Sequence, residues 1–186
     1  MNHLVKSRVI EHNEAQWVIA ARRGDLESFG RLYEKYYGLM VALAYSVLAD
    51  RHLAEDAAQE AFARACDNLG KLRQPDKFAS WLASICRNAA HQTLRQRKKL
   101  SFTDDPPTRV AKNQTDETVE VIREALWILP DPDREILVLR YFNDLSYEQI
   151  AQVLGKTVSA IHGRLLRARK KLAHKLKRMG FSGEKS

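Results

Sequence analysis

The sequence has little cysteine, no long hydrophobic run and no sustained strand-like alternation. Its two cysteines, Cys66 and Cys86, share no CxxC spacing and have no histidine at metal-ligand spacing, so we expect two reduced thiols rather than a metal or redox site. Apolar stretches such as Leu39–Ala44 are too short to span a bilayer. Residues 1–14 lack the apolar core of a secretory signal. These absences predict a cytoplasmic protein with no metal and no cofactor.

The sequence also lacks the residue constellations that enzymes acting on nucleic acids use. There is no serine or tyrosine nucleophile beside a supporting cluster, no evident pair of catalytic carboxylates and no glycine-rich phosphate loop. A recombinase is therefore a disfavoured alternative, and we expect a protein that is not an enzyme.

Positive charge is concentrated at the C-terminal end of the chain. The net charge is +8, and residues 156–186 contain ten Lys or Arg against one Glu. Such a lopsided distribution indicates contact with a polyanion. A solvated basic tail would have the same composition. The position of these charges within a motif therefore has to decide between a solvated tail and a surface that binds a polyanion.

Apolar residues at spacings of three and four predict four helices in the first hundred residues, the last from about Lys77 to Lys99. Asp25 and Asp50 are placed to cap the second and third of these helices. Gly70 and Pro75 mark a loop before the fourth. These helices together predict one helical bundle.

Composition changes after Leu100. Residues 101–118 contain Pro106-Pro107, several Thr and Asp, and almost no large apolar side chains, which is typical of a flexible linker. Fully extended, this segment would span about 60 Å, so the parts on either side need not touch. Helical periodicity returns at Val119.

The sharpest local signal is a helix-turn-helix between Leu145 and Leu172. Ser146 and Gln149 form a capping box, and Gly155 stands where the chain must turn. A second helix begins near Thr157 or Ser159. Its predicted inner stripe is Val158, Ile161, Leu165, Ala168, Leu172 and Leu176.

The outer face of that second helix is basic, which suits DNA. The start of a recognition helix reaches base edges, and later basic residues meet phosphates. We therefore predict base contacts from Ser159, His162 and Arg164, and phosphate contacts from Arg167, Arg169 and Lys171. The structural alternative is a helical hairpin with a solvated basic face. Together with the N-terminal helical bundle, the helix-turn-helix predicts an all-α fold of two small helical domains, 14–100 and 119–178. The flexible linker 101–118 joins these two domains.

Two features of the first domain bear on its role. An acidic and polar group lies on the third helix, namely Glu55, Asp56, Gln59 and Glu60. Taken alone, this group is better explained as a solvated face than as a binding surface. The fourth helix combines Trp81 with basic residues, as single-strand binding surfaces do, because bases stack on rings while cations track the backbone. A core tryptophan beside a charged outer face is an equal alternative.

Three blocks, in order, resemble the extracytoplasmic-function (ECF) sigma factors of the sigma-70 family. They are AEDAAQEAFARA (residues 54–65), KFASWLASICRNAA (77–90) and LPDPDREILVLRYFNDLSYEQIAQVLGKTVSAIHGRLLRARKKL (129–172). The resemblance covers both predicted domains and implies an RNA polymerase sigma factor that directs core enzyme to promoters and initiates transcription.

The resemblance also implies site residues and partners. The first domain would be sigma region 2, with Glu55, Asp56, Gln59 and Glu60 on the β′ clamp helices of core polymerase. The −10 element would be recognised and melted by Lys77, Trp81, Arg87, Asn88, His91 and Arg95, with a base flipped from the strand. The second domain, sigma region 4, would read the −35 element and contact the β flap. An anti-sigma factor is a candidate partner, although no residue identifies one.

The main rival is a helix-turn-helix regulator whose first domain senses a signal or dimerises. Such a regulator binds duplex DNA by itself, often at paired half-sites. A sigma factor binds weakly alone and acts with core polymerase.

Overall fold

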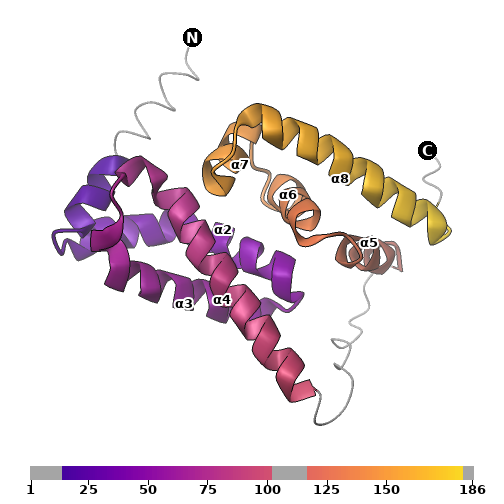
Figure 1. Ribbon diagram of the computed structural model, residues 1–186, viewed down its shortest axis with the longest axis horizontal. Helices are drawn as coiled ribbons and strands as arrows, with labels where there is room; N and C mark the ends of the chain where they lie inside the picture. The colour runs from indigo at the N-terminus through magenta and orange to yellow at the C-terminus, as the bar shows by residue number, and fades with distance from the viewer. Residues whose placement is uncertain (1–13, 102–116, 182–186) are drawn as a thin grey trace.

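The computed structural model describes residues 14–101 and 117–181, in which all regular structure is helical (Figure 1). Residues 14–21 are helical, and the N-terminal bundle continues with α2 (Leu26–Leu48), α3 (Arg51–Asn68), the short 3-10 helices η1 (Leu69–Lys71) and η2 (Pro75–Lys77), and α4 (Phe78–Ser101). The C-terminal bundle consists of α5 (Glu117–Trp127), α6 (Asp131–Tyr141), α7 (Tyr147–Leu154) and α8 (Val158–Arg178). The predicted all-α fold with two helical parts is confirmed.

Side chains next to each helix start set the boundaries of the N-terminal bundle. Asp25 accepts a hydrogen bond from the backbone N–H of Glu27, and Asp50 accepts one from that of Leu53, so both predicted N-caps are confirmed. Between them Ala49 ends α2 at φ 58°, in the left-handed region. The chain therefore reverses between α2 and α3 within two residues.

The core of the N-terminal bundle is built from large residues on two helices and small ones on the third. α2 and α4 contribute fully buried Leu32, Met40, Leu43, Phe78 and Leu82. The buried face of α3 is mostly alanine, at positions 54, 57, 58, 61 and 65, which lets the helices approach closely. α2, α3 and α4 each pack against the other two, as the purple and magenta ribbons show (Figure 1).

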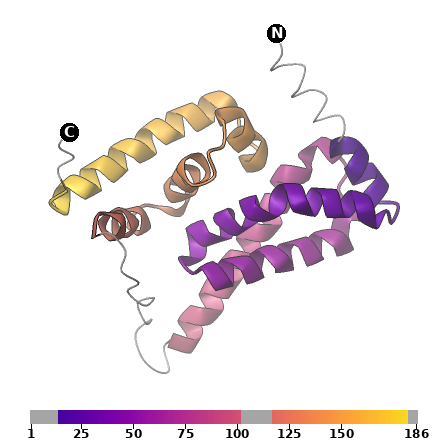
Figure 2. The same cartoon turned by 180° about the vertical axis from the view of Figure 1, so that it is seen from behind.

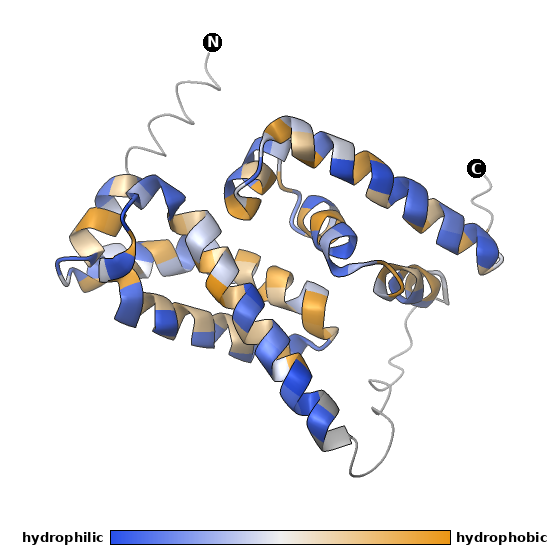
Figure 3. Ribbon diagram, viewed as in Figure 1, coloured by the Kyte–Doolittle hydropathy of each residue, from blue (hydrophilic) through white to orange (hydrophobic). Residues whose placement is uncertain are grey.

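In the C-terminal bundle, α8 packs against α5, α6 and α7. Its buried residues are Ile161, Leu165 and Ala168, while Leu172 is half-buried. The prediction that Val158 belongs to this inner stripe is wrong, because its side chain is 41% exposed in the first turn. The hydropathy colouring shows the long α8 as mainly hydrophilic along its outer side (Figure 3).

The two bundles are in contact. α6 packs on α2 and α7 packs on α4, and the buried residues of both bundles form one continuous cluster; the view from behind shows the same neighbourhood (Figure 2). The predicted linker is long enough for the two bundles to lie apart, so the sequence did not predict this contact. Ser101 ends α4 and Glu117 begins α5, so both ends of that segment are helical, and residues 102–116 lie outside the described part.

Among the described helices, none combines the length and apolar character needed to cross a bilayer.

Phe78 is the largest fully buried side chain, and its ring contacts Tyr36 at 5.7 Å and Trp81 at 6.1 Å between centroids. Phe78→Ala should lower the free energy of unfolding by about 3–5 kcal/mol, because it removes buried area and leaves a cavity. Urea denaturation followed by circular dichroism measures the change. Phe142→Ala is the matched control, since that ring is 68% exposed and its loss should cost under about 0.5 kcal/mol. Equal losses would contradict the packing described.

Candidate nucleic-acid and protein interfaces

The helix-turn-helix forms through local hydrogen bonds at its two helix starts. The Gln149 N–H donates to Ser146 Oγ (3.2 Å) and the Ser146 N–H donates to Gln149 Oε1 (2.8 Å), which confirms the capping box. Gly155 follows α7 at φ +61°, where a residue with a Cβ is strained. Thr157 then caps α8 by accepting from the N–H of Ala160 (3.2 Å). The turn geometry is the one that the sequence predicts.

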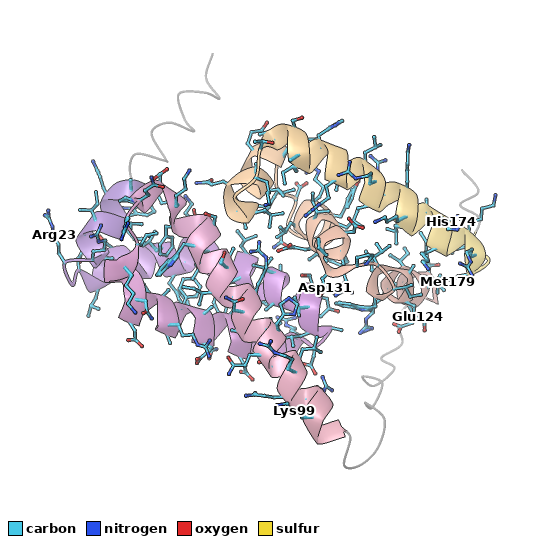
Figure 4. The ribbon with its side chains drawn as sticks, viewed as in Figure 1. Arg23, Lys99, Glu124, Asp131, His174 and Met179 are labelled. Carbon is cyan, nitrogen blue, oxygen red and sulfur yellow. The ribbon has the colours of Figure 1, made fainter. Side chains whose placement is uncertain are left out.

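α8 presents most of its predicted DNA contacts to solvent. Ser159, His162, Arg167 and Arg169 are exposed, and Arg164 is half-buried. His174 and Met179, labelled in Figure 4, mark the far end of the same helix, where further basic side chains project outward. The structure therefore gathers the six predicted −35 residues on one helix but places them around much of its circumference.

The ring of His162 is held by a neighbouring aromatic. It packs edge-on against Tyr147 of α7, with 5.7 Å between ring centroids, and the Arg140 guanidinium lies 5.9 Å from the centre of the tyrosine ring. Tyr147 thus links the first turn of α7 to the second turn of α8. This contact orients His162 near the N-terminal end of α8. In a recognition helix, that end is the one whose side chains contact base edges.

Lys171 lies toward the body of its own bundle. Its ammonium is 2.5 Å from Asp133 of α6, a carboxylate whose side chain is 11% exposed. The ion pair ties α8 to α6 and partly neutralises the cation that was predicted to meet phosphate. That prediction remains untested, but the geometry gives Lys171 a structural role as well.

Leu166 is a surface residue that the sequence analysis did not single out. Its side chain is 48% exposed, among the basic residues of α8. A helix turns by about 100° per residue, which places position 166 well away from the Ile161–Leu165 seam, and this geometry could have identified it. An exposed leucine there offers an apolar contact of the kind that suits a thymine methyl group.

The predicted −10 residues form a stripe along α4. Lys77 is exposed at the end of η2, Trp81 and His91 are half-buried, and Asn88 and Arg95 are exposed. Spacings of three, four and seven residues place these side chains on one face. Lys99, labelled in Figure 4, extends positive charge to the end of the helix.

Trp81 borders a shallow groove between the bundles. The groove has a volume of about 490 Å³ and is lined by Leu72, Arg73, Gln74, Lys77, Ser80, Trp81 and Ser84 from the N-terminal bundle, and by Leu154 and Gly155 from the C-terminal bundle. The Trp81 ring also packs on Phe78. Both alternatives for this tryptophan therefore have a structural basis, since one side of it is core and the other is accessible.

Arg87, the sixth member of the predicted −10 group, is engaged by the other bundle. Its Nε donates to Glu135 Oε1 of α6 at 2.5 Å, and the two side chains are 26% and 13% exposed. Neither Glu135 nor its neighbour Arg134 was singled out from the sequence. The available signal was their position directly before the apolar run 136–139, in the first half of α6.

The predicted polymerase-binding residues share the outer side of α3. Asp56 and Gln59 are exposed, and Glu60 is exposed but paired with Arg64 at 2.6 Å. Glu55 is half-buried and pairs with Arg51 at 2.9 Å. Three acidic side chains and one amide thus remain on an exposed face, two of them with their charge partly balanced.

The cysteines lie in different environments. Cys66 is exposed near the end of α3, whereas Cys86 is buried in α4, and burial raises the pKa of its thiol to about 12. Within residues 14–101 and 117–181 no three His, Cys, Asp or Glu side chains come together as a metal site would require.

Two protein families match this chain, in the order of the two bundles. Sigma-70 region 2 matches residues 32–100, and sigma-70 region 4 matches residues 120–172. The first match ends one residue before the end of α4, and the second begins inside α5 and includes the helix-turn-helix.

Curated relatives are similar over most of this chain. The protein named Probable RNA polymerase sigma factor RfaY, of Xanthomonas campestris pv. campestris, is 34% identical over 84% of this chain, which spans 42% of the length of RfaY. RNA polymerase sigma-H factor of Pseudomonas aeruginosa is 30% identical, and the match covers 86% of this chain and 91% of that factor. Several other relatives are named ECF RNA polymerase sigma factors.

A solved structure has the same fold. CnrH, in complex with the cytosolic domain of CnrY, is 28% identical with a TM-score of 0.63, and the match covers 89% of this chain and 98% of CnrH.

Because only a thiolate reacts readily, the two cysteines should differ in reactivity. At about pH 8, Ellman's reagent should modify Cys66 in the native chain within minutes, while Cys86 should react only after denaturation. Absorbance of the released product counts the thiols. Cys66→Ser should abolish the fast phase, whereas two fast thiols in the native chain would contradict the burial of Cys86.

Proposed function

Because the chain belongs to the sigma-70 family of RNA polymerase sigma factors, and to its ECF group, we propose that it brings core polymerase to specific promoters and initiates transcription there. The observation that carries this proposal is the division of surfaces along one chain. An acidic face on α3, an aromatic and basic stripe on α4 and a basic helix-turn-helix occur in the order of regions 2 and 4. The N-terminal bundle, residues 14–100, then acts as region 2, and residues 119–178 act as region 4.

In this proposal α3 docks on core polymerase. Asp56 and Gln59 are exposed, and Glu60 needs only to exchange Arg64 for a partner cation. Exposed ion pairs of this kind contribute little to stability, so their exchange costs little. An acidic surface of this kind fits a basic partner surface, which we assign to the β′ clamp helices, and the C-terminal bundle meets the β flap.

The two DNA-binding surfaces engage different forms of the promoter. The α4 stripe, with Trp81 near its start, suits the unpaired non-template strand of the −10 element, where a flipped base must regain the stacking energy lost on leaving the duplex. The start of α8, with Ser159, His162 and Arg164, suits base edges of the duplex −35 element. Arg167 and Arg169 then anchor the phosphates.

We propose that the chain acts in the cytoplasm, with the polymerase, and supplies no catalytic group of its own. Phosphodiester chemistry belongs to the core enzyme in this scheme. An anti-sigma factor is a further proposed partner, since the similar CnrH was solved in complex with another protein.

Reconstitution with core polymerase tests the function. Core enzyme plus this chain, given genomic DNA fragments, should start transcripts at a defined set of sites that core enzyme alone does not use, and sequencing of transcript 5′ ends identifies them. A chain that instead binds duplex half-sites tightly by itself and adds no start site would be a regulator.

Charge reversal on α3 tests the docking surface. The double variant Asp56→Lys, Glu60→Lys should weaken binding to core polymerase by at least about a hundredfold, because like charges then face each other across the interface. Fluorescence anisotropy of labelled chain titrated with core enzyme measures this. Glu34→Lys on α2 is the control for a single charge reversal, at an exposed acidic residue on another helix. Equal binding of all three proteins would move the docking surface elsewhere.

Substitution on α8 separates base contacts from phosphate contacts. Arg164→Ala should weaken holoenzyme binding at a cognate promoter by about 1–3 kcal/mol and leave non-cognate DNA nearly unchanged. Arg167→Ala should weaken both about equally. Electrophoretic mobility shifts at fixed salt give the two ratios. A uniform loss for Arg164→Ala would reassign that residue to phosphate.

A further inference from the structure

The recognition helix α8 carries a large apolar side chain that the core of its own bundle does not use. Leu166 is 48% exposed. The apolar cluster of the described residues takes Ile161, Leu165, Ala168 and Leu172 from α8, and Leu166 is not a member of it. A single exposed leucine is ordinary on a protein surface, so its position on the helix has to indicate what it does.

Leu166 lies between two cations that are proposed to bind phosphates. At about 100° per residue, it is about 130° around α8 from the middle of the buried face. Arg167 lies about 100° to one side of it and Arg169 about 60° to the other, and both are exposed. A helix that holds these cations on the phosphates bordering a groove directs the leucine between them toward the base edges on the groove floor.

Leu166 also lies close enough to the start of α8 to share a groove with it. Val158 begins the helix, and a rise of about 1.5 Å per residue puts Leu166 about 12 Å from it along the axis. The major groove of B-form DNA is about 12 Å wide and admits an α-helix. The first turns of α8, with Ser159 and His162, and the turn that carries Leu166 can therefore lie in the groove together.

Gly163 leaves space beside Leu166, on the side of the helix start. Apart from its chain neighbours and the helix backbone, a Cβ at Gly163 would have only a terminal guanidinium nitrogen of Arg167 within 4 Å, at 3.5 Å. That nitrogen is the end of a long, flexible side chain. A glycine inside a helix is less stable than an alanine, and no close packing in the structure requires one here. The glycine therefore lets a base edge approach the helix closely at this turn.

The chemistry of leucine limits what it can recognise in a major groove. Among the base edges there, the C5-methyl group of thymine is the apolar one. Leucine has neither donor nor acceptor, so it gains free energy by contact with that methyl group. Against the polar edge of another base it would displace water without replacing the lost hydrogen bonds. An apolar side chain in this place thus favours thymine and disfavours the other bases.

From this placement we infer that Leu166 is a specificity-determining residue, which reads the methyl group of a thymine in the −35 element, and that Gly163 admits the base edge to it. The inference deepens the proposed function and rests on it, since that function places α8 in the major groove. Ser159, His162 and Arg164 then read polar base edges, and Leu166 reads an apolar one about a turn further along the helix.

Replacement of thymine by uracil tests the inference, because it removes the methyl group and keeps every hydrogen-bonding group of the base edge. Holoenzyme assembled from core polymerase and the full chain first selects −35 sequences from a randomised promoter pool. Each thymine of the selected element, on both strands, is then replaced singly by deoxyuridine, and binding is measured by fluorescence anisotropy. One replacement should weaken binding about fourfold, the effect expected for one buried methyl group.

Variants assign this effect to its residues. Leu166→Ala, which keeps the helix propensity high, should bind the thymine promoter at least about fourfold more weakly and should no longer distinguish thymine from uracil. Val119→Ala in α5 is the matched control, because it shortens an apolar side chain that is also 48% exposed, and it should keep the preference. Gly163→Gln should retain its helix by circular dichroism and weaken binding to both promoters, since its side chain fills the approach.

The outcomes separate the inference from the proposed function. If no thymine replacement weakens binding, or if the loss persists undiminished in Leu166→Ala, the reading by Leu166 is overturned. Unchanged binding by Gly163→Gln overturns the role of the glycine. A pool from which holoenzyme selects no −35 sequence contradicts the proposed function itself, and the inference is lost with it.

Discussion

The guanidinium of Arg134 is the one buried cation among the residues that the structure describes, and it joins the two bundles by donating to the Ser46 carbonyl of α2. Burial lowers its pKa, the Asp131 carboxylate opposes that shift, and the group stays charged because arginine does not lose its proton in proteins. A charged group in such a place must find acceptors on all sides. It finds them in three carbonyls and a carboxylate, and Trp127 covers its flat face at 4.5 Å.

Different charges predominate at the predicted sites on different helices, which gives one small chain surfaces for different macromolecules. α3 exposes carboxylates, whereas α4 and α8 expose cations, and these surfaces have different chemical requirements. A protein surface is recognised by complementary charge, a single strand by stacking and a duplex by base edges. The junction between the bundles uses the same forces, because the Arg87–Glu135 ion pair joins α4 of one bundle to α6 of the other.

Local features of the sequence predicted local structure well, but the sequence did not predict contacts between residues far apart in the chain. Asp25, Asp50, Ser146 and Gly155 act through backbone groups a few residues away, so their roles follow from spacing alone. The same reasoning placed the predicted site residues on α3, α4 and α8, since helical periodicity sets the face of each. It missed the exposure of Val158, which is the first residue of α8. The partnership of Arg87 with Glu135 joins residues 48 positions apart, and no periodicity specifies such a pair.

Four helices begin at a residue whose own side chain accepts from the first turn, at Asp25, Asp50, Ser146 and Thr157. None of these caps draws on the opposite bundle. Each bundle therefore stabilises the starts of these helices by itself, and the contact between the bundles contributes packing and ion pairs rather than helix caps.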